Sequence, residues 1–464
     1  MTPGITVPRS ASSWLGGVAA DRQYLDAQSL SAVDAVQKEH MALEVVHKTA
    51  DVYGISRDLP LNYVSRKTAD EALIENLTRD KHLVIFGSSK QGKTSLRKHC
   101  LKDSDYIVVH CSNRWSLDEL HSAILKSAGY ELTLSTTKTE TGKSKISASL
   151  KAAIFGVGSE VAGEKAKESA QATTNRPLEL DASDVNDIIK ALSGFKRYIV
   201  LEDFHYLPIE TQRDFAVALK AFHEQSKLCF IIVGVWLEEG RLTVYNGDLT
   251  GRIFSINADK WAYDELEQVI TGGEALLNIS FTTDFKTELL KQCLDSVYIV
   301  QESCYQACVA AGVHETREQM LTIGESVDVT QVIRDVVNQQ TGRYNSFITQ
   351  FAAGFQDTAL AMYKWLLYPV LTADIAHLEE GLRYREMRKT LQAKHPQGTE
   401  LNPGNLTQAL QFTASLQVKK EIKPIVLDYD QTNLLLRVVD RGFLIWLRNQ
   451  DRKELLDLAD LPSI

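Results

Sequence analysis

Residues 87–94 read Gly87-Ser-Ser-Lys-Gln-Gly92-Lys93-Thr94, a complete match to the pattern GxxxxGK[ST]. The apolar run His82-Leu-Val-Ile-Phe86 stands directly before the match, and residues 93–101 after it are predicted to form a helix. A strand, a glycine-rich loop and a helix in this order can surround phosphate groups with backbone N–H donors, and the helix N-terminus adds partial positive charge. The stretch therefore predicts a site for a nucleoside triphosphate.

Each residue type of the loop has an expected task. Lys93 would reach the β- and γ-phosphates, and the hydroxyl of Thr94 would hold Mg²⁺. A glycine-rich turn that binds nothing is the alternative, and the predicted strand and helix on either side argue against it. We therefore expect ATP and Mg²⁺ as cofactors. The predicted nucleotide-contacting residues are Gly87, Ser88, Ser89, Lys90, Gln91, Gly92, Lys93, Thr94 and Ser95.

Two acidic residues follow a second predicted core strand. Tyr198-Ile-Val-Leu201 runs into Glu202 and Asp203, and open α/β sheets bind ligands at the carboxyl ends of their strands. One acid would hold Mg²⁺ and the other would polarise the attacking water. By position Glu202 is the metal-side acid and Asp203 the base, although the two roles could be exchanged. Acids that merely begin a loop are the simpler alternative.

Strand and helix signals alternate between residues 59 and 258, as a parallel sheet requires. Residues 133–183 interrupt the alternation with many Ser, Thr, Lys, Ala and Gly, and are expected to be an insertion, either a surface loop or a contact element. The predicted fold class is α/β, with the parallel sheet of a P-loop NTPase. The expected strands are 82–86, 106–111, 197–201, 228–235 and 253–256, and the expected helices are 93–101, 116–129 and 210–226.

The remaining chain is predicted to be mainly helical. Residues 1–58 form an N-terminal helical arm, residues 259–330 a helical lid, and residues 331–464 a helical region with a winged helix-turn-helix. In that last region residues 405–420 would be the recognition helix, and residues 431–433 would be the tip of a two-stranded wing. The predicted segments are helices at 263–277, 284–311, 331–394 and 405–420, and strands at 424–427 and 434–439.

Composition restricts the class of protein. The 464 residues carry a net charge of -9, which excludes a protein that coats nucleic acid over its whole surface but leaves room for a local basic patch. The sequence has six cysteines and no CxxC motif, so the cysteines are expected to be buried thiols. No apolar stretch is long enough to span a bilayer and no signal peptide is evident, so we expect a cytoplasmic protein without a membrane partner.

The motifs resemble those of the AAA+ ATPases, in particular the STAND and origin-recognition-like branches with archaeal-type members. These join a nucleotide domain to a helical lid and a winged helix. The resemblance covers most of residues 60–460 and rests on the loop, the acidic pair and the segment Tyr63-Val64-Ser-Arg66. It implies that Tyr63, Val64 and Arg66 lie near the adenine base, and that Arg252 completes the site of a neighbouring subunit. Ordinary packing and a surface arginine are the respective alternatives.

The sequence departs from the family pattern in ways that favour slow turnover. The acids are ordered Glu-Asp, Ile232-Val-Gly234-Val-Trp236 lacks a polar sensor, and Val300-Gln301-Glu302 stands where the lid arginine is expected. The resemblance therefore implies a slowly hydrolysing ATPase switch that controls self-association or a separate effector protein, by analogy in prokaryotic defence or mobile-element regulation. The alternatives are an ATP-dependent DNA-binding factor acting through residues 370–450, and a nucleotide-binding scaffold without turnover. Few basic residues lie on the predicted recognition helix, which favours a protein-protein or autoinhibitory role.

Overall fold

The computed structural model describes residues 45–138, 144–150 and 178–463. His47–Ile464 form one compact unit. Most of the helical arm predicted over residues 1–58 lies outside the described residues, and its described part contains one short helix, α2 (Thr49–Val52). Tyr53 beside α2 is buried and donates its hydroxyl to the carbonyl of Ile270 at 2.6 Å. This part of the predicted arm therefore packs on the helices that follow the sheet.

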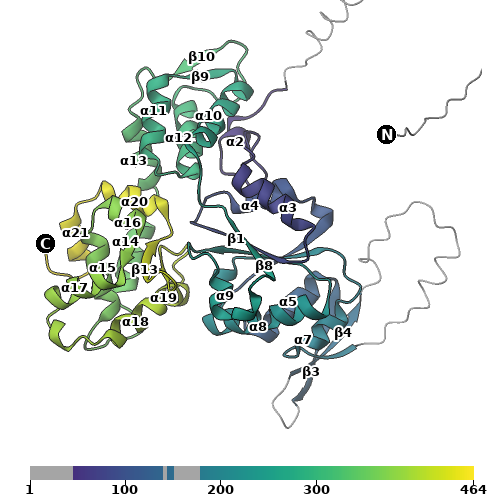
Figure 1. The fold of residues 1–464 in the computed structure, drawn as a ribbon. Coiled ribbons are helices and arrows are strands. Elements are labelled where there is room, and N and C mark those ends of the chain that lie inside the picture. Colours follow the sequence, from purple (N-terminus) through teal and green to yellow (C-terminus); the bar gives the residue numbers. More distant parts are fainter. Residues whose placement is uncertain (1–44, 139–143, 151–177, 464) are drawn as a thin grey trace, which may run out of the picture. The chain divides into compact units, whose positions relative to one another are not determined.

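A five-stranded parallel sheet lies at the centre of the nucleotide-binding part (Figure 1). Its strand order is β2-β6-β7-β1-β8, so β1 has a neighbour on either side. All five strands predicted from the sequence are confirmed. Their bounds are β1 (His82–Gly87), β2 (Tyr106–His110), β6 (Tyr198–Glu202), β7 (Phe230–Val235) and β8 (Ile253–Asn257).

Helices cover both faces of the sheet, which explains why its strands are mainly apolar. Along β1, Leu83 and Ile85 pack on one face and Val84 and Phe86 on the other, since successive side chains of a strand alternate. Every residue of β1 and β7 is buried, so the strands form a rigid base for the loops at their carboxyl ends. The first face packs on α3 (Ala72–Leu77) and α4 (Lys93–Cys100), and the second on α5 (Leu117–Ser127), α7 (Val185–Ala191), α8 (Ile209–Gln225) and α9 (Arg241–Tyr245) (Figure 1).

The described ends of the predicted insertion form a second, antiparallel sheet. It consists of β3 (Tyr130–Lys138), β4 (Ser144–Leu150) and β5 (Leu178–Asp181), with β4 in the middle. The sequence predicted an insertion here, either a surface loop or a contact element, and did not predict these strands, because their strand character comes from long-range pairing rather than from apolar runs. Residues 139–143 and 151–177 lie outside the described residues.

Three helices and a short parallel strand pair follow the main sheet. They are α10 (Tyr263–Leu277), β9 (Ile279–Phe281), α11 (Thr283–Gln292), α12 (Val297–Ala310) and β10 (Leu321–Ile323). The single helix expected over residues 284–311 is in fact two, since Leu294 and Asp295 adopt left-handed backbone angles (φ 50° and 53°) and form a turn. This turn, residues 293–296, reaches the phosphate-binding loop.

The C-terminal part is helical with a small antiparallel sheet. The helix expected over residues 405–420 divides at Phe412, whose φ of -98° and ψ of 8° end one helix and begin the next. No helix among the described residues has the length and apolar character needed to cross a membrane. The helices are α13 (Val329–Asn338), α14 (Thr341–Ala352), α15 (Met362–Thr372), α16 (Ile375–Glu380), α17 (Tyr384–Lys394), α18 (Pro403–Gln411), α19 (Thr413–Lys419), α20 (Arg441–Arg448) and α21 (Arg452–Leu458), and the sheet has the order β11 (Leu382–Arg383), β13 (Leu435–Val438), β12 (Leu427–Asp430).

Candidate functional site

The predicted phosphate-binding loop lies between β1 and α4, at the carboxyl edge of the parallel sheet. A side chain at Gly87 would place its Cβ 2.8 Å from the backbone nitrogen of Asp259, so only glycine fits there. Gly92 adopts a φ of 77° in the left-handed region, and α4 begins at the next residue. The N-terminus of α4 therefore lies at the end of the loop, where its partial positive charge favours an anion.

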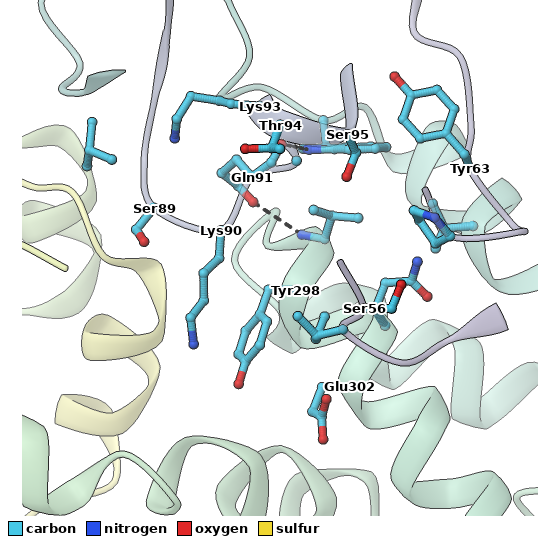
Figure 2. A pocket seen from close by; sticks show the side chains of 18 of the residues that line it. Ser56, Tyr63, Ser89, Lys90, Gln91, Lys93, Thr94, Ser95, Tyr298 and Glu302 are labelled. Carbon is cyan, nitrogen blue, oxygen red and sulfur yellow. Dashed lines mark hydrogen bonds between the residues drawn. The ribbon is translucent and has the colours of Figure 1, made fainter. Parts of the chain in front are cut away.

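A cavity of about 540 Å³ lies beside this loop, within the size range of ligand pockets. Figure 2 shows Ser89, Lys93 and Thr94 on one side of the cavity and Tyr298 and Glu302 of α12 on the other. The hydroxyl-bearing Thr94 is exposed to it. The predicted site residues that line the cavity are Ser89, Lys90, Gln91, Gly92, Lys93, Thr94, Ser95, Glu202, Asp203, Tyr63 and Val64.

Lys93 is buried and bonded to the loop itself. Its ammonium group donates to the carbonyl oxygens of Gly87 at 3.0 Å and Ser88 at 2.5 Å. Burial lowers the pKa of Lys93 to about 8, although the nearby carboxylates of Asp259 and Glu202 act in the opposite direction. A triphosphate would add negative charge beside the ammonium group and would therefore favour its protonated form.

The two predicted acids have different surroundings. Glu202 is buried, and its Oε1 accepts a hydrogen bond from Nε of Arg97 at 2.9 Å. Arg97 stands one helical turn after Lys93 on α4 and lies over the ring of Tyr106. Asp203 has a φ of 60°, and burial raises the pKa of its carboxyl group. Sequence reasoning missed Arg97, although its spacing from Lys93 was a usable signal.

The donor set fits a magnesium ion that is shared with a nucleotide. Thr94, Glu202 and Asp203 line the same cavity and offer the oxygen ligands that Mg²⁺ prefers. Among the described residues, no group of three or more His, Cys, Asp or Glu side chains could form a metal cage. Mg²⁺ is commonly held by one or two carboxylates together with phosphate oxygens, so this site would bind the ion with the nucleotide.

The opposite end of the cavity is formed by the segment before the sheet and by α12. Asn62 and Gln301 both line the cavity and exchange two amide hydrogen bonds of 2.9 Å, which ties the segment to the helix. Tyr63 stacks on His99 with 4.4 Å between ring centroids and donates to Asp70 at 2.7 Å. The contact of Tyr63 and Val64 with an adenine base remains a prediction.

Arg66 and Arg252 are not brought to this cavity. Arg66 is buried over the ring of Trp261 at 4.2 Å and donates to the carbonyl of Ala258, because a buried guanidinium needs such partners. Arg252 precedes β8, at the amino end of the sheet, where Nη2 pairs with Glu224 at 2.8 Å. Its role in the site of a neighbouring subunit stays a prediction.

The loop is bonded to the C-terminal part of the chain. The N–H of Ser89 donates to the carbonyl of Val439 at 2.8 Å. Asp259 joins the two parts, since Oδ1 accepts the N–H of Ser88 at 2.7 Å and Oδ2 pairs with Nη2 of Arg441 at 2.6 Å. Burial acts to raise the pKa of Asp259, but Arg441 and the Ser88 donors outweigh it and lower the pKa. We name this set of contacts the loop latch.

The turn at residues 293–296 completes the surroundings of the loop. The carbonyl of Leu294 accepts from Nη1 of Arg441 at 2.7 Å, and the side-chain amide of Gln91 donates to the carbonyl of Asp295 at 2.9 Å. Gln91 therefore lines the cavity and also links the loop to the helices that follow the sheet. Asp259 and Arg441 were missed from the sequence, where Arg441 gave no local signal.

A second contact holds the small C-terminal sheet. Arg241 makes two hydrogen bonds to Asp428 of β12, of 3.2 and 2.5 Å, and both side chains are buried. Glu238 accepts from the backbone N–H and the hydroxyl of Thr432 at 3.1 and 2.7 Å. Val418 of α19 packs in an apolar cluster with Val235, Ile425 and Val439. Parts of the predicted recognition helix and wing tip are therefore engaged with the nucleotide-binding part.

Comparisons with known proteins give partial structural similarities only. No protein-family model and no curated protein matches the sequence. Among solved structures, the chain is similar to the Walker-type ATPase PABY2304 of Pyrococcus abyssi, with 13% identity over 83% of this chain and 96% of that chain and a TM-score of 0.44. It is also similar to the ORC1 protein of Aeropyrum pernix in complex with DNA (10% identity, 87% and 96% covered, TM-score 0.42) and to the ORC2 protein of the same organism in ADPNP-ADP complexes (13%, 84% and 92%, 0.40).

These similarities are distant, so the type of fold is decided by the geometry of the chain itself. β1, the loop and α4 follow one another at the carboxyl edge of a parallel sheet, and two acids at the end of β6 line the same cavity as the loop. This chain therefore has a P-loop nucleotide-binding fold.

Proposed function

We propose that this chain is a molecular switch of AAA+/STAND type that binds ATP with Mg²⁺ and hydrolyses it slowly. The observation that carries the proposal is the loop latch, in which Ser89 of the phosphate-binding loop donates to Val439 and Asp259 links Ser88 to Arg441. A loop N–H that donates to Val439 is not available to a phosphate oxygen. Nucleotide binding and docking of the C-terminal part are therefore coupled, and each weakens the other.

The residues of the cavity support a hydrolytic reaction. Lys93 would hold the phosphates, and Thr94 with Glu202 would hold the magnesium ion, which supplies charge neutralisation when bound. Asp203 would polarise the attacking water. Its raised pKa supports this role, because a general base works best when its pKa approaches the operating pH. The hydrogen bond from Arg97 orients Glu202 at the end of β6.

Nucleotide binding and turnover are tested with two variants of the full chain. ATP binding is measured by calorimetry and hydrolysis by phosphate release, for the wild type, Lys93→Ala and Asp203→Ala. We expect Lys93→Ala to lose ATP binding, and Asp203→Ala to bind ATP while its phosphate release falls by two orders of magnitude or more, about the contribution of a general base. A wild-type rate equal to that of Lys93→Ala would instead support a nucleotide-binding scaffold without turnover.

The switch would act on self-association or on a separate effector protein. Measuring molecular mass in solution with ATP, with ADP and without nucleotide tests self-association directly. By family analogy the setting is prokaryotic defence or mobile-element regulation in the cytoplasm. Arg252 would complete a neighbour's site in such an assembly, so Arg252→Ala should lower turnover only under conditions in which the protein associates.

An ATP-dependent DNA-binding factor is the second candidate. The order β11, α17, α18, α19, β12, β13 favours a winged helix-turn-helix within residues 370–450. The contacts of Thr432 with Glu238 and of Val418 with the apolar cluster mean that DNA binding by this face would require its release. ATP-dependent DNA binding that is lost in Arg385→Glu/Lys389→Glu, on α17, would favour this candidate.

A further inference from the structure

A basic groove lies at the amino-terminal edge of the parallel sheet, whereas the phosphate-binding loop lies at the carboxyl edge. Basic residues stand just before three neighbouring strands, β6, β7 and β1, and they line one cavity of about 390 Å³. We name this cavity the edge groove. Its basic residues are Arg79, Lys81, Lys196, Arg197 and Lys227.

The positive charge of the edge groove is poorly balanced. Asp80 is the one acid among its described lining residues, and it pairs with Lys227 at 3.2 Å. Both side chains are largely exposed, at 70% and 90%, so this pair contributes little. The other four basic side chains make no ion pair with any of the described residues. This concentration is opposite in sign to the net charge of -9 of the whole chain.

The fold does not require these cations. The strand dipoles of a parallel sheet point the same way and leave its amino edge slightly positive, so this edge does not need positive side chains, and neighbouring like charges repel one another. Two polar rings in the groove already have partners, because the Tyr198 hydroxyl donates to Leu77 at 2.8 Å and the ring of His82 bonds to Leu219 and Phe230. His223, which also lines the groove, packs edge-on against the ring of His82. The cations are therefore the groups that the groove offers to a ligand.

The spacing of the cations suits a chain of phosphates. β6, β7 and β1 are consecutive in the sheet, and strands lie about 4.8 Å apart, so the row of cations is about 10 Å long. One strand of double-helical DNA presents a phosphate every 3.4 Å or so along the axis, about three over this length. We propose that the edge groove binds the phosphodiester backbone of a nucleic acid without reading its sequence. This site is independent of the nucleotide cavity and of the predicted winged helix.

The proposal is tested by fluorescence anisotropy of a short labelled DNA duplex with the full chain over a range of salt concentrations. For Lys196→Glu/Arg197→Glu we expect at least tenfold weaker binding and a salt dependence shallower by about two, since each lost phosphate contact changes the slope by about 0.9. Sequence changes in the duplex should have no effect. Retained ATP binding by the variant shows that the chain is folded.

A matched control separates the edge groove from the basic residues of the C-terminal part. Arg385→Glu/Lys389→Glu makes the same change in charge on α17 and should leave duplex binding within about twofold, as expected for distant screened charges. If that variant abolishes binding while Lys196→Glu/Arg197→Glu does not, the C-terminal part is the site and the proposal is wrong. Absence of duplex binding by the wild type at low salt, or equally tight binding of polyglutamate, would also overturn it.

Discussion

Replacing Arg441 with alanine should strengthen nucleotide binding. In the latched arrangement Arg441 pairs with Asp259 at 2.6 Å and donates to Leu294 at 2.7 Å, and the side chains of the ion pair are 16% and 8% exposed. A hydrogen bond to a charged group contributes about 1.5–3 kcal/mol, and we take about 2 kcal/mol for the pair. We assign the loss to the latched state alone, because release of the C-terminal part separates Arg441 from Asp259 and Leu294.

This energy converts to affinity through the fraction of released chains. A change of about 2 kcal/mol raises the ratio of released to latched protein about thirtyfold, and the apparent Kd falls with that ratio while most chains are latched. We therefore expect Arg441→Ala to bind ATP about ten to thirty times more tightly, as measured by calorimetry on the full chain. Its free energy of unfolding without nucleotide should fall by about the same 2 kcal/mol.

Arg437→Ala is the matched control for this experiment. Arg437 pairs with Asp430 at 3.6 Å and donates to Glu380 at 3.0 Å, all within the C-terminal part, so its loss leaves the loop latch intact. Its nucleotide affinity should remain that of the wild type. Unchanged ATP binding by a folded Arg441→Ala protein would refute the coupling. Weaker binding would also refute it, since Arg441 would then support nucleotide binding instead of opposing it.

Three further predictions concern the loop and the acids. Burial lowers the pKa of Lys93 to about 8, so above pH 8 the unfolded chain holds a proton on Lys93 that the folded chain has lost. The free energy of unfolding, measured with urea, should therefore rise between pH 8 and about 10. Lys93→Met should show no such rise. Arg97→Ala leaves Glu202 buried and unpaired and should lower the free energy of unfolding by about 3–5 kcal/mol. The double variant Arg97→Ala/Glu202→Gln should recover part of this loss. If the losses of the two single variants simply add in the double variant, the two side chains are not paired. Gly87→Ala should unfold at a lower temperature and lose ATP binding, because a Cβ at this position meets the backbone of Asp259. Gly342→Ala, whose Cβ meets nothing within 4 Å, should do neither. If both variants melt at the temperature of the wild type, the inference that only glycine fits at residue 87 is wrong.

The strands and most helices could be predicted because their signals are local. β1 and β7 are buried along their whole length and apolar except for His82, and α10 begins and ends where its periodicity does, at Tyr263 and Leu277. The predictions failed where distant residues decide the conformation. The break at Leu294 and Asp295 serves contacts to Gln91 and Arg441, and β3 to β5 depend on one another for their hydrogen bonds.

By itself the sequence determined the phosphate-binding loop and the position of the two acids. Both depend on short patterns, namely glycines at tight turns and an apolar strand that ends in carboxylates. Only the tertiary structure decided that Arg97 holds Glu202, 105 positions away, and that Arg441 reaches Asp259 across 182 positions. Many charged residues could serve as such partners, and the choice among them is made by packing, which brings one pair together and leaves the others in water.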